Sequence, residues 1–149
     1  MIDQFDGKYA FLSNFYDSPI PVRVGNEIYT AKTVEHAFQA AKTLLYDNPM
    51  AIRILTAETP GKAKKLGRHC RLHPDWEEVK DRVMLDLVRK KFQDPELAQK
   101  LIATGDEELI EGNWWGDRYW CVCEGQGQNK LGNILMKIRK ELKEVYNYE

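Results

Sequence analysis

The stretch TVEHAFQAAK, residues 33–42, combines an apolar helical pattern with a carboxylate and an ammonium group. On a helical wheel Glu35 lies about 60° from Phe38 and about 20° from Lys42, so both charges share one side of the predicted helix. If Thr33 caps this helix, the helix dipole favours the Glu35 charge by about 0.3–1 kcal/mol. Glu35 is then either a helix-stabilising residue or a pre-oriented catalytic carboxylate, and Lys42 is either an anion-binding group or a surface lysine.

A basic run, TPGKAKKLGRHCRLHP, spans residues 59–74 without one acidic residue. It is either a solvated face or an anion subsite centred on Arg68, whose guanidinium can present a fork to a phosphate. His69 and His73 have the i, i+4 spacing of zinc ligands on a helix. Gly67 before this pair and Pro74 after it disfavour a continuous helix there, and no Cys or carboxylate is placed to complete the set, so the sequence disfavours a metal site.

The segment GQGQNKLG, residues 125–132, leads from a predicted strand into the last predicted helix. It lacks the third glycine of a dinucleotide-binding fingerprint, where Lys130 stands, and it is not a P-loop. Backbone N–H groups at such a helix start can bind an anion, with Asn129 or Lys130 as additional donors. A plain N-cap and turn is the alternative interpretation.

The segment NWWGD, residues 113–117, places two indoles and a carboxylate in consecutive positions. Trp114 and Trp115 cannot both point inward from an extended segment, so one is expected at a cleft, where an indole can stack on a base. The alternative is that the tryptophans, Trp76 included, are core residues. Two carboxylates, aromatic surfaces and anion sites fit a nucleoside-phosphate-like ligand and hydrolysis of a glycosidic bond through an oxocarbenium-like state.

Helices that begin after capping residues are expected to position these groups. The expected starts are Thr33, Asn48 with Pro49, Thr59 with Pro60, Asp75 with Glu78, Asp94 with Pro95, and about Asn129. The third helix is expected to end at Gly67 and the fifth at Gly105, and two short strands flank a turn at residues 25–26. With a further strand at YWCVCE, residues 119–124, the prediction is an α+β fold: a single, mainly helical domain over residues 1–149 with a small strand component.

Composition places limits on the function. The net charge of −1 predicts no general attraction to nucleic acid or membrane, so the function must be local. The first residues lack the basic start and apolar core of a signal peptide, and no stretch approaches the roughly 18 apolar residues of a membrane span. A cytoplasmic location is therefore expected. Cys70, Cys121 and Cys123 are an odd number without a Cys-x-x-Cys motif, so they are expected to be reduced.

Eight segments, taken in order, resemble a known family. They are FLSNFY, VEHAFQAAK, TPGKAKKLGR, DWEEVKDRVM, KF, LIATGDEELIE, WWGD and GQNKLGNILMKIR. Their order and rough spacing are similar to those of the NADAR superfamily, and in particular of its YbiA-like N-glycosidases, over nearly the whole chain. The resemblance implies cleavage of an N-glycosidic bond without a metal or an organic cofactor. Members hydrolyse the ribosylamino-pyrimidine phosphates that begin riboflavin synthesis, and relatives remove ADP-ribose from guanine in nucleic acid.

Carried over position by position, the resemblance implies that Glu35 is the principal catalytic carboxylate and that Asp117 assists catalysis or holds the ribose. Lys42 would accompany Glu35, and Ser13, Asn14 and Phe15 would line the pocket together with Gly116. Trp76 and Trp115 would stack on the base and sugar or line the pocket around them. The residues that would face phosphate are Arg68, Gly127, Asn129 and Lys130.

The chain departs from the family pattern in two places. Nine residues, 118–126, separate WGD from GQN, which is longer than the YbiA-like pattern and could reshape the pocket. Lys130 stands where an arginine is usual, which keeps the charge but loses the bidentate fork.

The predicted function is hydrolysis of a phosphorylated ribosyl or ADP-ribosyl compound, with ADP-ribosylated nucleic acid among the candidate substrates. The alternative is a module that binds ADP-ribose or NAD without hydrolysing it. A third reading, nucleic-acid binding through residues 62–71, gains little from the net charge of −1.

Overall fold

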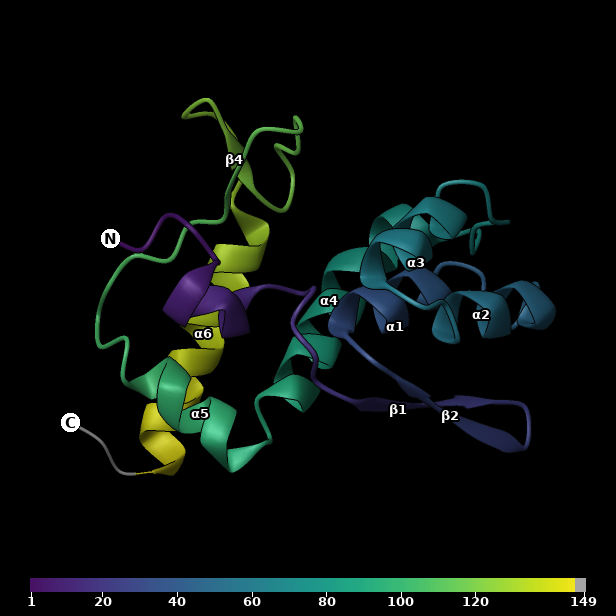
Figure 1. The fold of residues 1–149 in the computed structure, drawn as a ribbon, viewed down its shortest axis with the longest axis horizontal. Coiled ribbons are helices and arrows are strands. Elements are labelled where there is room, and N and C mark those ends of the chain that lie inside the picture. The colour runs from purple at the N-terminus through teal and green to yellow at the C-terminus, as the bar shows by residue number, and fades with distance from the viewer. Residues whose placement is uncertain (147–149) are drawn as a thin grey trace. The chain divides into compact units, whose positions relative to one another are not determined.

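The computed structural model describes residues 1–146 of the 149-residue chain (Figure 1). The chain divides into two compact units. The central unit is Asn14–Lys91, and the terminal unit joins Met1–Ser13 to the chain from Phe92 onward. Helices predominate and the strands are few and short, so the predicted α+β fold is confirmed. The prediction of a single domain stays a prediction.

The central unit begins with a two-stranded antiparallel sheet. Strand β1 (Ile20–Val24) pairs with β2 (Glu27–Ala31), with Ile20 opposite Ala31. The turn between them contains Gly25 at a φ of +62°, a conformation that glycine adopts without a steric penalty. Ile20, Val24 and Ala31 are buried, so one face of this sheet contributes to the core. The two strands predicted around residues 25–26 are therefore confirmed.

Four helices complete the central unit. They are α1 (Val34–Ala41), α2 (Asn48–Leu55), α3 (Pro60–Gly67) and α4 (Trp76–Lys91). Thr33 accepts a hydrogen bond from the backbone N–H of His36, and Thr59 accepts one from that of Lys62, as their predicted capping roles require. Helix α1 packs against α2, α3 and α4, so the helix that carries Glu35 lies in the middle of its unit.

The cap of α2 corrects one prediction. Asp47, not Asn48, is the N-cap, and its side chain accepts from Met50 N at 3.1 Å. The N–H of Ala51, which Asn48 would cap, already donates to the carbonyl of Asp47 at 3.0 Å. Asn48 is instead the first residue of the helix, and its Oδ1 accepts from Leu45 N at 2.8 Å.

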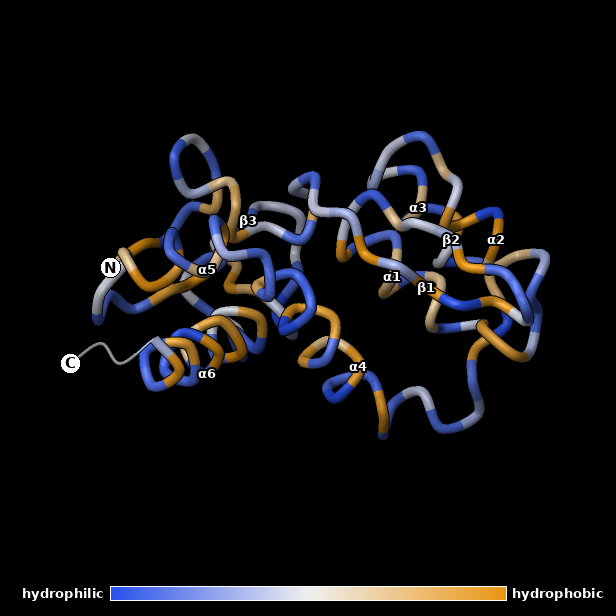
Figure 2. Tube along the Cα trace, turned by 90° about the horizontal axis from the view of Figure 1, so that it is seen from below, coloured by the Kyte–Doolittle hydropathy of each residue, from blue (hydrophilic) through white to orange (hydrophobic). Residues whose placement is uncertain are grey.

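The terminal unit is built around a helix pair. Helix α5 (Pro95–Ile102) packs against α6 (Lys130–Val145), and a 3-10 helix η1 (Gly7–Leu12) adds Phe11, whose ring lies edge-on to Phe92. Leu131, Leu135 and Ile138 form the buried stripe of α6. Figure 2 shows the corresponding alternation of hydrophobic and hydrophilic segments along this helix.

Two elements of the terminal unit are shorter than predicted. Helix α5 ends at Ile102 rather than Gly105, because the N–H groups of Thr104 and Gly105 bond three residues back and tighten the chain into a turn. Of residues 119–124, only β4 (Val122–Cys123) forms a strand, paired in parallel with β3 (Gly112–Asn113). The chain then turns at once, since Cys123 and Gln126 exchange two backbone hydrogen bonds.

Among the residues with a described structure, no helix combines the length and the apolar character that crossing a bilayer demands.

Candidate functional site

The start of α1, where Glu35 lies, is anchored to the rest of the central unit. Glu35 N donates to the carbonyl of Asn14 at 3.1 Å. In the His36 ring, Nδ1 lies 2.8 Å from Thr33 Oγ1, and Nε2 lies 2.9 Å from Ala57 O. Burial lowers the pKa of His36, so the ring is neutral, donating to Ala57 and accepting from the Thr33 hydroxyl. These contacts fix where Glu35 enters its helix.

The Glu35 side chain is buried and takes a hydrogen bond from its own helix. It is 7% exposed, and Gln39 Nε2 donates to its Oε1 at 3.1 Å. An amide donor and a position in the first helical turn both favour the charged form of a carboxylate. Sequence reasoning did not assign a role to Gln39, although its i, i+4 spacing from Glu35 on one helix face was a usable signal.

Lys42 lies at the C-terminal end of α1 and is half-buried. Burial lowers the pKa of its ammonium, the negative charge of Glu35 opposes this, and the positive charges of Lys64 and Arg68 reinforce it. Lys42 therefore lies close enough to Glu35 and to Arg68 for their charges to influence its pKa. The anion-binding roles predicted for Lys42 and Arg68 stay predictions.

The basic residues of the segment 59–74 lie in different surroundings. Arg68 is exposed at the end of α3, and the loop that follows returns to α1, where His73 N donates to Lys42 O at 2.6 Å. Lys62 and Lys65, with Arg53 of α2, line a separate hollow of about 490 Å³. Lys62 pairs with Glu58 at 2.8 Å.

Three predicted pocket residues of the central unit differ in exposure. Trp76 is 6% exposed and its ring centroid lies 5.2 Å from that of Phe38, so it packs as a core residue against α1. Asn14 is also buried: its Nδ2 donates to Met84 Sδ at 3.4 Å, and its Oδ1 has no hydrogen-bond partner. Phe15 is 45% exposed. Their predicted substrate contacts stay predictions.

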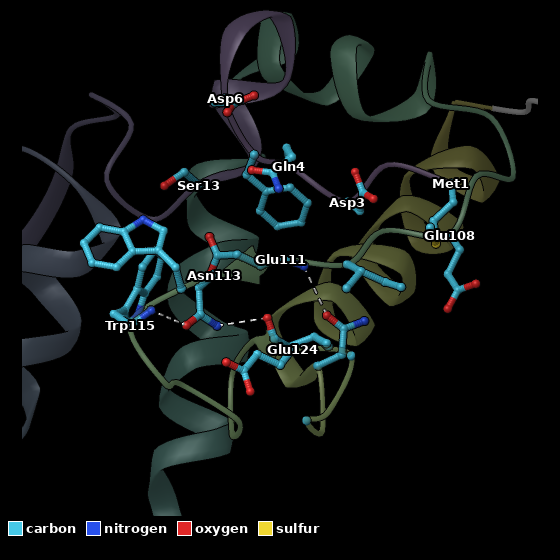
Figure 3. Close-up of a pocket in the computed structure, with 18 of the residues that line it drawn as sticks. Met1, Asp3, Gln4, Asp6, Ser13, Glu108, Glu111, Asn113, Trp115 and Glu124 are labelled. Carbon is cyan, nitrogen blue, oxygen red and sulfur yellow. Dashed lines mark hydrogen bonds between the residues drawn. The ribbon is translucent and has the colours of Figure 1, made fainter.

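A cavity of about 870 Å³ lies in the terminal unit (Figure 3). Ser13, Trp115, Gly127 and Asn129, all predicted substrate-binding residues, line it. Its acidic lining residues are Asp3, Asp6, Glu108, Glu111 and Glu124, and no lysine or arginine is among the described residues that line it. The amino terminus of Met1 also borders the cavity and pairs with Glu107. This charge distribution is unfavourable for a phosphate, so the anion-binding roles predicted for Gly127 and Asn129 gain no support here.

Asn113 organises the loop that carries Trp115 and Asp117. Its Oδ1 accepts from Trp115 N at 3.1 Å, and its Nδ2 donates to Val122 O at 3.1 Å (Figure 3). The same Oδ1 accepts from Asp117 N at 3.1 Å, and the same Nδ2 donates to Asp117 O at 2.8 Å. Sequence reasoning did not assign this role. The available signal was an asparagine next to glycine and aromatic residues, because an asparagine side chain readily bonds the backbone two residues on.

Asp117 is held by its own turn. Its Oδ1 accepts from Tyr119 N and Trp120 N, each at 3.0 Å, and its Oδ2 lies 3.6 Å from Cys121 Sγ. The Cys121 thiol also donates to Glu111 Oε1 at 2.7 Å. Burial and the two carboxylates raise the pKa of Cys121 far above its usual range, so it is a neutral hydrogen-bond donor rather than a nucleophile. Asp117 thus has one oxygen engaged by two backbone N–H groups.

Both indoles of residues 113–117 face outward. Trp114 is 88% and Trp115 is 50% exposed, their rings lie 6.0 Å apart edge to face, and both line the cavity. The prediction that one of them lies exposed at a cleft is confirmed, and the second is exposed as well. The alternation of an extended strand does not apply, because Gly116 adopts a φ of +90° and the Asn113 bonds turn the chain.

Asn129 and Lys130, at the start of α6, make contacts within the terminal unit. Asn129 has a left-handed conformation, its Oδ1 accepts from Glu111 N at 3.3 Å, and its Nδ2 donates to Leu109 O at 2.9 Å. Lys130 Nζ lies 4.7 Å from the centre of the Tyr119 ring. Asn129 is therefore at the predicted N-cap position, but its side chain joins α6 to the segment before β3 instead of capping the helix.

The predicted site residues form two groups. The central unit holds Asn14, Phe15, Glu35, Lys42, Arg68 and Trp76, and the terminal unit holds Ser13, Trp115, Gly116, Asp117, Gly127, Asn129 and Lys130. Cys70, Cys121 and Cys123 are free thiols. Within residues 1–146, no three or more His, Cys, Asp or Glu side chains are grouped as a metal would require.

The fold and the site define a mainly helical α+β protein with a buried carboxylate at the start of a central helix. The NADAR domain matches residues 2–143, and the chain belongs to this family. The resemblance seen in the sequence is thereby confirmed.

Several relatives are named for an activity or a pathway. N-glycosidase YbiA of Shigella flexneri is 38% identical over 141 residues, which cover 90% of this chain and 82% of the relative. A riboflavin biosynthesis protein of Vibrio vulnificus is 37% identical over 150 residues, which cover 96% of this chain but only 38% of the relative. The NMR structure of YbiA from E. coli matches with a TM-score of 0.79 at 34% identity, over 100% of this chain and 90% of that one.

Proposed function

We propose that this protein is an N-glycosidase that hydrolyses the N-glycosidic bond of a phosphorylated ribosyl or ADP-ribosyl compound. The observation that carries the proposal is Glu35, a buried carboxylate held at the start of α1 and hydrogen-bonded by Gln39. The names of the N-glycosidase relatives support the reaction class. Two relatives named as riboflavin biosynthesis proteins support a ribosylamino-pyrimidine phosphate as the first substrate to test.

In the proposed reaction, the bond between sugar C1 and the base nitrogen breaks and its electron pair leaves with the nitrogen. C1 acquires oxocarbenium character, which the Glu35 carboxylate stabilises. Water then attacks C1, and a proton of that water passes to a carboxylate acting as general base, while the departing nitrogen takes up a proton, so that the products are the free sugar and the neutral base. Asp117 shares the acid–base work, and its Oδ2 is the oxygen not bonded to the turn of residues 118–120.

Phosphate recognition is assigned to the cations of the central unit. Lys42 follows Glu35 on α1, and Arg68 lies at the end of α3. The two residues are close enough for the charge of Arg68 to influence the pKa of Lys42. A phosphate bound there would offset their mutual repulsion, and the Arg68 guanidinium can bind two phosphate oxygens at once. The substrate class is therefore an anionic N-riboside.

The test incubates the protein separately with ribosylamino-pyrimidine phosphate and with ADP-ribosylated guanine in DNA. Mass spectrometry then detects the released base or sugar. Product from the first substrate alone assigns the riboflavin-type reaction, and product from the second alone assigns removal of ADP-ribose. The proposal fails if neither substrate yields product after prolonged incubation and if ADP-ribose or NAD raises the melting temperature of the protein. The protein is then a binding module.

Glu35→Gln is the matched variant for this test. The substitution keeps the shape of the site and removes the charge, so turnover should be abolished while ligand affinity stays within roughly tenfold of the original. Isothermal titration measures the affinity. Turnover that survives in this variant would refute the role of Glu35.

A further inference from the structure

Gln39 occupies an unusual position for a buried amide. It lies one helical turn after Glu35, is 5% exposed, and donates from Nε2 to Glu35 Oε1 at 3.1 Å. A carboxylate only accepts hydrogen bonds, so the NH₂ group must be the end of the amide that faces it. The other end, Oε1, is buried without a hydrogen-bond partner. The fold therefore leaves a carbonyl oxygen unsatisfied while the amide donates to Glu35.

Gly67, the last residue of α3, provides the space in which the Gln39 amide lies. A Cβ atom at this position would lie 1.9 Å from Gln39 Oε1 and 2.8 Å from Gln39 Cδ, which no real contact permits. Gly67 is buried, and its φ is outside the left-handed region that favours glycine. Space, rather than backbone conformation, thus requires glycine here. The interpretation of Gly67 as a helix stop alone is incomplete.

We propose that Gly67 and Gln39 form a positioning pair that holds the Glu35 carboxylate in a single orientation. Gly67 leaves room for the Gln39 amide beside α3, and the amide in turn directs one N–H at Glu35. A fixed carboxylate needs no reorganisation when positive charge develops at the sugar carbon. The inference rests on the proposed function of Glu35, but the orientation of Glu35 can be tested without turnover.

Other charged groups surround Gln39 and Glu35, and they also influence the titration of the Glu35 carboxylate. The charged or titratable groups on or around α1 include Lys42 and His36 of α1, Lys64 of α3, Arg68, Cys70 and His73 after it, Asp47 near Cys70, and Asp17 and Lys32 beside the sheet. Gln39→Met alters none of them, whereas Gly67→Ala replaces a residue whose carbonyl accepts from Cys70 Sγ at 3.4 Å. A rise in the Glu35 pKa that both variants share is therefore attributable to the amide.

The deciding measurement is the pKa of the Glu35 side chain, followed by the ¹³C chemical shift of its carboxyl carbon. Glu35→Gln identifies the signal. Gln39→Met has a similar volume but no donor, so the Glu35 pKa should rise by about half a unit to one unit, because a hydrogen bond to the charged form is lost. Gly67→Ala should cause a rise in the same direction by displacing the amide.

Gly61→Ala is the matched control, because it lies in the same helix and its Cβ would meet only Thr59 Oγ1, at 3.9 Å. It should leave the Glu35 pKa unchanged. If Gln39→Met does not fold, the Glu35 pKa in Gly67→Ala tests the positioning pair instead. An unchanged Glu35 pKa in a folded Gln39→Met or Gly67→Ala protein overturns the positioning pair, as does an equal rise in Gly61→Ala.

Turnover separates this inference from the proposed function. With an active substrate, Gln39→Met and Gly67→Ala should lower kcat by about tenfold, leave KM nearly unchanged, and move the acid limb of the kcat/KM profile to higher pH. A merely structural defect would lower activity equally at all pH values. If the wild-type protein turns over no substrate while the Glu35 pKa still rises in both variants, the pair stands and the N-glycosidase proposal fails.

Discussion

At the scale of single residues, the site depends on charges whose surroundings differ from water. Glu35 is buried beside an amide donor, and the half-buried Lys42 has an ammonium whose pKa burial lowers. A lysine in such surroundings loses its proton at a lower pH than an exposed lysine, so its anion-binding form is lost earlier as the pH rises.

We therefore expect KM for a phosphorylated substrate to rise as pH increases, beginning below the ordinary lysine pKa of about 10.4. Lys42→Arg, which stays charged, should remove this alkaline rise. Lys42→Met should raise KM by roughly tenfold at neutral pH and also remove it, because no titrating ammonium remains. KM measured from pH 7 to 10.5 checks both. Substitution of the exposed Lys65 is the control and should leave the alkaline rise in KM unchanged. A rise in KM that persists in Lys42→Arg would assign the titration to another group.

At the scale of secondary structure, α1 is positioned by contacts at its first turn. The His36 ring joins Thr33, the cap of α1, to the carbonyl of Ala57 after α2. Since burial lowers the pKa of His36, the folded protein holds this ring neutral at a pH where the unfolded chain begins to protonate it. Folding is then coupled to the charge of one imidazole.

The stability of the protein should accordingly fall as pH decreases below the ordinary histidine pKa of about 6.5. There the unfolded state binds more protons than the folded state, so the free energy of unfolding rises with pH, by at most about 1.4 kcal/mol per pH unit for one group. Urea unfolding between pH 5 and 7.5 measures this slope. His36→Gln retains an amide that can donate to Ala57 but does not titrate, so the slope should be smaller in this variant. An identical slope would exclude His36 as its source.

The helices were predictable because their signals are local. Thr33 and Thr59 cap helices that follow them immediately, as predicted, whereas the prediction for α2 was one residue late, because its cap is Asp47 and not Asn48. The loop of residues 113–127 was not predictable, since its shape depends on hydrogen bonds between distant residues. Examples are the bonds from Asn113 Nδ2 to Val122 O and from Val122 N to Glu111 O.

The site was predictable to the extent that its residues share one helix. The helical spacing placed Glu35 and Lys42 on one side, and the family resemblance raised Glu35 from a helix-stabilising residue to a catalytic candidate. The packing of Gly67 against Gln39 joins two helices, and no periodicity in the sequence reveals it. The acidic cavity likewise gathers residues from segments far apart in the chain.

At the scale of the whole molecule, the terminal unit is assembled from both ends of the chain. Ile2 N donates to Glu108 O at 2.8 Å, and Ile110 N donates to Ile2 O at 2.9 Å. The central unit, residues 14–91, is therefore inserted between two segments that pair with each other. The two carboxylates assigned to catalysis belong to different units, Glu35 to the central one and Asp117 to the terminal one.

We propose that the two units nevertheless unfold as one domain. Each holds about half of the chain, and a chain of that length buries only about 60% of its surface when it folds alone. Trp76 lies in the central unit and Trp120 in the terminal unit, so their indole N–H signals in NMR spectra report on each unit separately. In a urea titration both signals should disappear with midpoints that agree within about 0.3 M, as a two-state transition requires. If the Trp76 signal survives beyond the loss of the Trp120 signal, or the reverse, the protein consists of two domains.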